Sequence, residues 1–150
     1  MIYFVDEDFQ AFGSWIAELR MRGLDTIPLS SADDAFATLC RAPSSEVRLV
    51  IIDVMLAVEN IQDDRFSVER THLYLETGLR LLEDLSEQNP VVFPKRAALL
   101  TNTNNEATLS AVRRTCKSCG IPLWEKWRMA SPMDFGDKVA NHLASLGPGD

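Results

Sequence analysis

The chain has 150 residues, of which 46% are hydrophobic and 25% are charged, and its formal net charge is -7 at pH 7. This length and balance predict one folded domain over residues 1–150 and argue against a disordered or fibrous chain. The acidic charge argues against direct binding of nucleic acid or of an anionic membrane, because both favour a basic patch.

The apolar stretches have the length of strands, and none approaches the roughly 20 residues that cross a bilayer. We therefore expect no membrane insertion and a cytoplasmic, unprocessed chain. An odd number of cysteines, three, fits a reducing compartment. Cys116 and Cys119 form a CxxC pair, which occurs in redox sites and in zinc sites. A redox role is disfavoured because the pair stands at the end of a helix, where a thiolate is destabilised. A zinc role is disfavoured because two further ligands at the usual spacing are missing. We interpret the pair as small, partly buried side chains.

Strand and helix patterns alternate through the first third of the chain, which predicts βαβ units and a parallel sheet. Apolar residues at helical spacing before Gly23 indicate the first helix, and Ser31 is a suitable cap for the second. The expected elements are, in chain order, a strand over residues 2–5, a helix over about 8–21, a strand over 25–29, a helix from Ser31 that ends before Pro43, and a buried strand over 48–52.

The segment over residues 54–77 breaks this pattern, because a simple connection from a strand to the next helix has about 2–6 residues. We expect residues 57–67 to form a surface loop. Apolar residues keep helical spacing over 68–85, which predicts an extended third helix to about Gln88. Gly78 costs this helix about 1 kcal/mol relative to alanine, so a break there is the alternative. Residues 54–77 are therefore interpreted as an extended loop or insertion.

The second half of the chain repeats the alternation. Thr103 and Glu106 form a capping box for a helix that runs to about Cys116, and Pro132 suits the first position of a last helix. The expected elements are a strand over 97–100, this capped helix, a short strand over 121–124, a final helix that begins after Ser131, and a tail over 147–150.

Polar residues follow four of the predicted strands: Asp6 and Glu7, Asp53, Thr101, and Lys126. The carboxyl ends of parallel strands lie along one edge of a sheet, where ligands bind, so these side chains are expected in one pocket. Two carboxylates about 4 Å apart repel by about 4 kcal/mol at an effective dielectric of 20, which calls for a cation among them. Mg²⁺ fits oxygen ligands of this kind, and the lysine would supply a second positive charge.

In this order the residues resemble the receiver domain of two-component response regulators. The resemblance spans nearly the whole chain and is carried by the ordered set Val5-Asp6-Glu7-Asp8, Leu49-Val50-Ile51-Ile52-Asp53, Leu99-Leu100-Thr101 and Trp124-Glu125-Lys126. It implies a doubly wound, flavodoxin-like α/β fold, in which a five-stranded parallel sheet has the order 2-1-3-4-5 and helices cover both faces.

The resemblance also assigns roles at the expected phosphorylation site. Asp53 would be the phosphoacceptor, whose carboxylate attacks phosphorus to form an acyl phosphate. Lys126 would pair with the phosphoryl oxygens, and the Thr101 hydroxyl would move to hydrogen-bond one of them. Catalysis of this kind consists chiefly of positioning and charge neutralisation.

The cofactor and partners that the resemblance implies are Mg²⁺ and other signalling proteins. Asp6 and Glu7 would hold Mg²⁺, assisted by Asp53 and by the backbone carbonyl of Met55. The phosphodonor would be a histidine kinase or a phosphotransfer protein in a phosphorelay. The output would be a downstream protein or a homodimer that binds through the fourth helix, fifth strand and fifth helix.

Several positions depart from the receiver pattern. The residues after Asp53 lack the usual Met-Pro, and Trp127 stands where proline commonly follows the lysine. Leu123 occupies the place of the aromatic switch residue, with Trp124 beside it, and Asn102 is larger than the residue common after the threonine. These departures point to an altered relay between the threonine and the fifth strand.

Other functions remain open from the sequence alone. Singly, Asp6 could be a helix cap, Thr101 part of a turn and Lys126 a solvated side chain. A phosphorylation-independent pseudo-receiver that binds partners would tolerate the departures. A remote alternative is a Mg²⁺-dependent phosphohydrolase, which needs an acid two residues after its nucleophile, where Met55 stands. We therefore expect a signalling domain and not an enzyme.

Overall fold

The protein is seen in a computed structural model that describes residues 1–56, 64–71 and 75–146. Its five strands form one sheet in the order β2-β1-β3-β4-β5, and every adjacent pair is parallel. This order and the flanking helices confirm the predicted doubly wound, flavodoxin-like fold. The strands are β1 (Ile2–Val5), β2 (Thr26–Leu29), β3 (Leu49–Asp53), β4 (Ala97–Thr101) and β5 (Leu123–Glu125).

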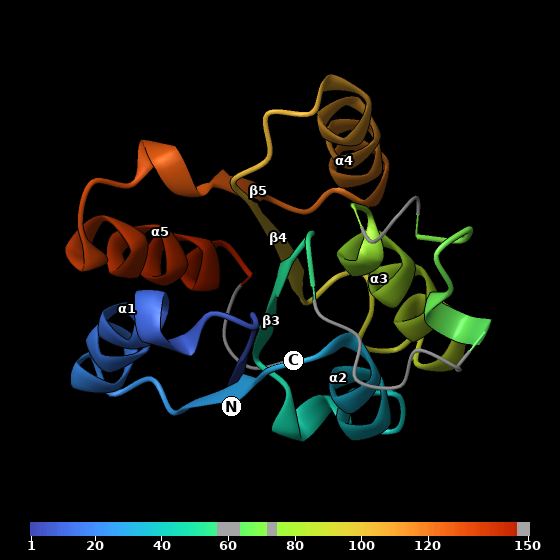
Figure 1. Cartoon of the computed structure of the whole chain (residues 1–150). Coiled ribbons are helices and arrows are strands. Elements are labelled where there is room, and N and C mark those ends of the chain that lie inside the picture. The colour runs from blue at the N-terminus through green and yellow to red at the C-terminus, as the bar shows by residue number, and fades with distance from the viewer. Residues whose placement is uncertain (57–63, 72–74, 147–150) are drawn as a thin grey trace.

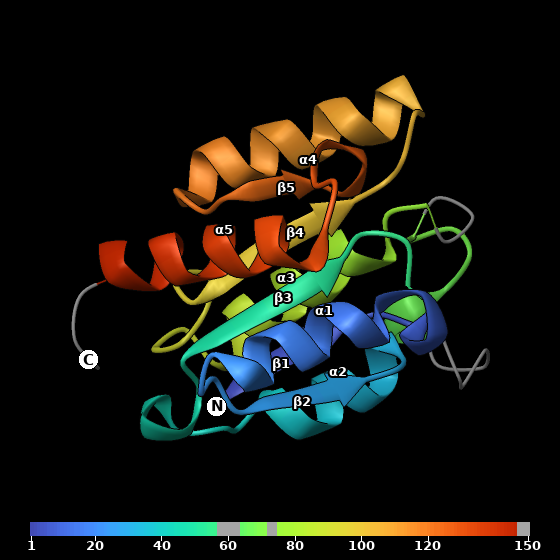
Figure 2. The ribbon, with the colours of Figure 1, turned by 90° about the vertical axis from the view of Figure 1, so that its left-hand side faces the viewer.

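Helices cover both faces of the sheet (Figure 1). One face carries two helices, α1 (Phe9–Met21) and α5 (Pro132–Ser145), which lie side by side in both views (Figures 1 and 2). The other carries α2 (Ala32–Leu39), α3 (Thr77–Gln88) and α4 (Glu106–Cys119). Because successive strand residues point to opposite faces, the strands β1, β3, β4 and β5 contribute to two separate apolar cores.

The alternation is clearest in β1 and β3, whose residues are all buried. Tyr3 and Val5 join the core beneath α2, α3 and α4, while Ile2 and Phe4 join the core beneath α1 and α5. Burial on both faces explains why these strands are nearly continuous apolar runs in the sequence, as central parallel strands usually are.

The caps of the helices follow local sequence, with one exception. The side chains of Ser31 and Ser131 each accept a hydrogen bond from the third following backbone N–H, as expected for N-caps. The capping box at Thr103 and Glu106 was a wrong prediction, because Asn105 caps α4 by accepting from the Thr108 N–H at 3.0 Å. Asn105 is nearer to the first helical turn, and its amide oxygen reaches that donor directly.

Some predicted bounds also differ from the structure. Strand β3 begins at Leu49 and includes Asp53, and β4 extends to Thr101, so both of these site residues lie within the sheet. Strand β5 begins at Leu123, two residues later than predicted, and α4 continues to Cys119 before Gly120 ends it in a left-handed conformation. Only glycine adopts that conformation without strain.

The part of the insertion over residues 64–71 is packed against the body of the domain, so the prediction of a surface loop was wrong for residues 64–67. Asp64–Phe66 form a 3-10 turn, and the Phe66 side chain is fully buried in the core beneath α2 and α3. The guanidinium of Arg70 donates to both carboxylate oxygens of Asp84 on α3, with 2.8 Å to Oδ2. The remainder of that loop prediction, residues 57–63, lies outside the described residues.

The third helix does not start at Val68 as predicted. Residues 68–71 form turns, the structure is not described over 72–74, and α3 begins at Thr77. The Gly78 N–H donates to the Val54 carbonyl at 2.7 Å, which holds the start of α3 against the end of β3. A Cβ atom at Gly78 would overlap the Asp53 carbonyl oxygen and lie 2.7 Å from the Val54 Cα. Glycine is required here because two backbones meet.

Replacement of Gly78 by alanine is therefore expected to destabilise the domain. The added methyl group must displace the backbone of β3, and forced overpacking of this kind costs about 1–3 kcal/mol. Gly13→Ala is the matched control, because Gly13 lies in α1 and an added Cβ would meet no atom within 4 Å apart from its chain neighbours and the backbone of its own helix. That control should gain up to about 1 kcal/mol from helix propensity. Urea unfolding measures both values, and equal stability of the two variants would contradict the close approach.

Candidate functional site

Two carboxylates and one ammonium group meet at the carboxyl edge of the sheet. Asp6 directly follows β1, Asp53 ends β3, and Lys126 directly follows β5. The Lys126 Nζ atom lies 3.0 Å from Asp6 Oδ2 and 2.8 Å from Asp53 Oδ2, close enough to donate to both. The tertiary structure therefore joins positions 73 and 120 residues apart in the chain.

The second oxygen of each carboxylate is held by the local backbone. Asp6 Oδ1 accepts from the Asp8 N–H at 3.0 Å, and Asp53 Oδ1 accepts from the Met55 N–H at 3.1 Å. Each aspartate thus bonds the residue two positions ahead, a turn geometry that aspartate side chains favour. Because all four oxygens have a partner, the two carboxylates are fixed relative to Lys126.

This arrangement perturbs the ionisation of both Asp53 and Lys126. Burial, followed by the charge of Asp6, raises the pKa of Asp53 to about 7, although Lys126 acts in the opposite direction. Burial by itself would lower the pKa of Lys126, but Asp53 and Asp6 outweigh it and the lysine pKa is raised. The cluster therefore holds more negative charge than one ammonium group offsets.

Phe12 is a member of the site that the sequence reasoning did not identify. The Lys126 ammonium lies 4.2 Å from the centre of the Phe12 ring, within the range of a cation–π interaction. The ring also packs edge-on against Trp15, a buried residue of the same helix. In the sequence, Phe12 is one of several apolar residues on a helical face, and no signal separates it from the core.

Apart from the hydrogen bond of the Met55 N–H to Asp53, no direct contact joins the other predicted site residues to this cluster among the interactions of the described residues. Glu7 is exposed, and the Met55 side chain is 42% exposed while its backbone N–H serves Asp53. Thr101 is buried at the end of β4, where its hydroxyl oxygen accepts from the Thr103 N–H at 3.1 Å. Among the described residues, no group of three or more acidic, histidine or cysteine side chains is arranged to hold a metal ion.

The donor set nevertheless fits a hard divalent cation. Mg²⁺ uses oxygen ligands, keeps several waters and is commonly bound by only one or two carboxylates, which Asp6 and Asp53 would supply. Burial and the charge of Asp6 raise the pKa of Asp53, and a nearby cation would oppose this rise.

The cysteine pair is separate from this site. Cys116 is buried near the end of α4, where burial and then Cys119 raise the pKa of its thiol to about 12. A thiol that stays protonated is a poor nucleophile and a poor metal ligand. All three cysteines are free thiols, in line with the interpretation of the pair as small packed side chains.

No helix in the described part of the chain is long and apolar enough to cross a membrane. Neither a protein-family model nor a curated protein sequence matches the chain.

Solved structures, in contrast, match it over almost its whole length. A CheY-like response regulator receiver domain from Methanospirillum hungatei has a TM-score of 0.65 at 18% identity, and the match covers 96% of this chain and 93% of that one. The receiver domain of NtrX from Brucella abortus has a TM-score of 0.60 at 26% identity, with 97% and 98% covered. The BeF3-activated receiver domain of RstA from Klebsiella pneumoniae has a TM-score of 0.63 at 20% identity, with 95% and 97% covered. The shared topology shows that this chain has the fold of the response regulator receiver domains. The low sequence identities show that it is a divergent form of that fold.

Proposed function

We propose that the chain is a phosphoacceptor receiver domain in two-component signal transduction and that Asp53 is its phosphorylation site. The observation that carries this proposal is the contact of one lysine with two aspartates at the ends of three different strands. A buried ion pair alone is often structural, but a lysine shared by two carboxylates at the ligand-binding edge of an α/β sheet is typical of a site that handles negative charge. The receiver fold supports the same conclusion.

The chemistry requires an ionised Asp53. Its carboxylate oxygen would attack the phosphorus of a phosphohistidine on a kinase or phosphotransfer protein, the phosphorus–nitrogen bond would break, and the imidazole would leave with the electron pair. Lys126 would follow the transferred group, exchanging its contact with the Asp53 carboxylate for one with a phosphoryl oxygen. Phe12 would keep the lysine ammonium at the site throughout.

We propose Mg²⁺ as the cofactor, held by Asp6 and Asp53 with Glu7 and the Met55 carbonyl completing the site. When bound, the ion would neutralise charge on the phosphoryl oxygens and keep Asp53 ionised at neutral pH. The Asp8 N–H, which holds Asp6 Oδ1, would orient this ligand toward the ion. A location in the cytoplasm, where a kinase and Mg²⁺ are available, belongs to the same proposal.

The output would be a protein partner or a second copy bound at α4, β5 and α5. The side chain of Trp127 is 64% exposed directly after Lys126 and stacks with Arg128, which offers such a partner an aromatic anchor. Trp124, in contrast, is buried against Phe135 and His142 in the core beneath α1 and α5. It does not face α4, so a relay from Thr101 through an aromatic residue of β5 is not supported. A partial shift between two states is more consistent with this packing than a complete switch.

A phosphorylation-independent pseudo-receiver is the second candidate. Lys126 already bridges the two carboxylates, and the described residues contain no third acid in contact with them. Such a closed cluster would serve stability and leave Trp127 as a constant docking residue. Phosphorylation of the isolated protein distinguishes the two candidates.

The first prediction from the proposed function concerns phosphorylation itself. Incubation of the wild-type protein with acetyl phosphate and Mg²⁺ should add the mass of one phosphoryl group, and Asp53→Ala should add none. Glu87→Gln, which removes an exposed carboxylate on α3, is the control and should behave as wild type. Intact-mass spectrometry measures the added phosphoryl group. Beryllofluoride binding is the second assay, for the case in which Asp53 accepts a phosphoryl group only from its kinase and not from acetyl phosphate. A wild type without either response would favour the pseudo-receiver.

The second prediction concerns Mg²⁺. Calorimetric titration should show one Mg²⁺ bound by the wild type, and Asp6→Asn should weaken it by about tenfold or more because one of two carboxylate ligands is lost. Glu7→Gln should weaken it to a smaller extent, since Glu7 is exposed. Glu87→Gln again serves as the control. Equal affinity of Asp6→Asn and wild type would remove Asp6 from the proposed site.

The third prediction concerns pH in the metal-free protein. Because the pKa of Asp53 is raised from 3.8 to about 7 in the folded state, the folded protein binds this proton more tightly than the unfolded chain. The bound proton therefore stabilises the folded protein. This stabilisation is complete below about pH 4 and is lost as the pH rises to about 7. The asparagine side chain in Asp53→Asn cannot ionise, so the free energy of unfolding of this variant should rise relative to that of the wild type between about pH 4 and pH 7. The rise should be on the order of 1–4 kcal/mol, and the difference should be constant above this interval. Urea unfolding with EDTA measures it, and a difference independent of pH would contradict the raised pKa.

A further inference from the structure

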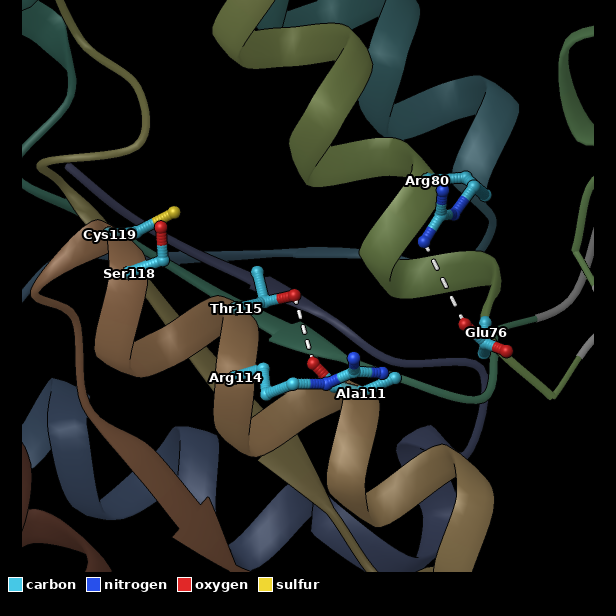
Figure 3. Close-up of a pocket in the computed structure, with 7 residues that line it drawn as sticks. All are labelled: Glu76, Arg80, Ala111, Arg114, Thr115, Ser118 and Cys119. Atoms are coloured by element: carbon cyan, nitrogen blue, oxygen red, sulfur yellow. Dashed lines mark hydrogen bonds and ion pairs between the residues drawn. The ribbon is translucent and has the colours of Figure 1, made fainter.

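A groove between α3 and α4 lies apart from the acidic site and has two connected lobes. The larger lobe, of about 490 Å³, is lined by Glu76, which directly precedes α3, by Arg80 of α3 and by residues of α4 that include Arg114 and Thr115 (Figure 3). The smaller lobe, of about 240 Å³, continues along α3 past Leu79 and Leu82. The lobes share Arg80, Thr115 and Cys119, so they form one continuous groove. The larger lobe falls in the size range of small-molecule pockets.

The guanidinium of Arg80 stands where the two lobes join, and it is only partly satisfied. Its Nη1 atom donates to the exposed carboxylate of Glu83 at 2.8 Å, whereas Nη2 lies 3.7 Å from Glu76, beyond hydrogen-bond distance. Its Nε atom is buried without an acceptor among the described residues. A buried donor on a charged group that lacks a partner is costly, so the side chain gains from any acceptor it can turn toward.

A second guanidinium lies across the groove. Arg114 is exposed on α4 and forms no ion pair within residues 1–56, 64–71 and 75–146. In Figure 3 its side chain lies at α4 beside Ala111, and Arg80 and Glu76 lie on the opposite side of the groove. The Nε and Nη2 atoms of Arg80 form the edge at which guanidinium groups bind carboxylates and phosphates through two parallel hydrogen bonds. Two guanidinium groups, each with free donors, thus flank a groove that has an apolar end at Leu79 and Leu82.

We propose that this groove binds a small organic oxyanion, whose carboxylate or phosphate group pairs with Arg80 and Arg114 and whose apolar part lies against Leu79 and Leu82. The anionic group would draw the Arg80 guanidinium away from its long contact with Glu76 and satisfy the Nε donor. The apolar lobe adds affinity for an aromatic or short aliphatic body through the burial of its surface. The site does not depend on phosphorylation of Asp53.

The test is an NMR titration of ¹⁵N-labelled, unphosphorylated protein in EDTA, so that the acidic site takes no part. Benzoate and phenyl phosphate are the probes, inorganic phosphate lacks the apolar part, and benzyl alcohol lacks the charge. At least one of the two amphipathic anions should give saturable shifts at the amides of residues 80, 115 and 119 and at the Arg80 side-chain Nε–H. Which of them binds more tightly assigns the site to carboxylates or to phosphate esters. Inorganic phosphate and benzyl alcohol should each bind about fivefold or more weakly.

Variants separate the proposed groove from nonspecific attraction to positive charge. Arg114→Gln should weaken the amphipathic anion by about fivefold or more, and Arg80→Lys should weaken it as well, because lysine lacks the planar edge. Arg113→Gln is the matched control, since Arg113 is exposed on the same helix but pairs with Glu125 and does not line the groove. Linear, non-saturating shifts, equal loss in all three variants, or shifts centred on Lys126 would overturn the proposal.

Discussion

The contact of Lys126 with Asp6 and Asp53 is the interaction on which the rest of the site depends. Two carboxylates at the ends of neighbouring parallel strands repel each other, and burial deprives them of the water that would otherwise screen them. The lysine arrives from β5, two strands away from β3, and its ammonium offsets part of this charge. Asp53 keeps a raised pKa, so the neutralisation is incomplete.

Incomplete neutralisation has a cost in stability, and under the proposed function it would favour the binding of a divalent cation. A fully compensated cluster would have less preference for a further cation. Here the folded protein tolerates a carboxylate whose ionisation is unfavourable, and a divalent cation would relieve the strain between the two aspartates. Functional sites commonly retain such local instability because the chemistry needs it. The Phe12 ring adds to this balance by holding the ammonium in place without adding a negative charge.

The insertion after β3 is part of the folded core in its described portion. Phe66 fills the space beneath α2 and α3, Arg65 stacks on Phe36 of α2, and Arg70 binds Asp84 of α3. These contacts tie α2 and α3 together beside the strand that carries Asp53. The start of α3 contacts the same strand through Gly78, so α3 is packed directly against the end of the strand that carries Asp53. The groove between α3 and α4 therefore borders elements that lead directly to the acidic site.

The sequence by itself determined the alternation of strands and helices and most of their bounds, because these depend on local apolar spacing and on caps such as Ser31 and Ser131. It also indicated Asp6, Asp53 and Lys126, since each stands at the end of a recognisable strand pattern. The third helix was misplaced because the helical spacing was counted from Val68, which is exposed in a turn, whereas the nearby apolar residue that joins the core is Phe66. Only the tertiary structure decided that Phe12 contacts Lys126, that Trp124 faces α5, and that Arg80 and Arg114 share a groove. These facts depend on distances between elements that are remote in the chain, and local sequence carries no record of them.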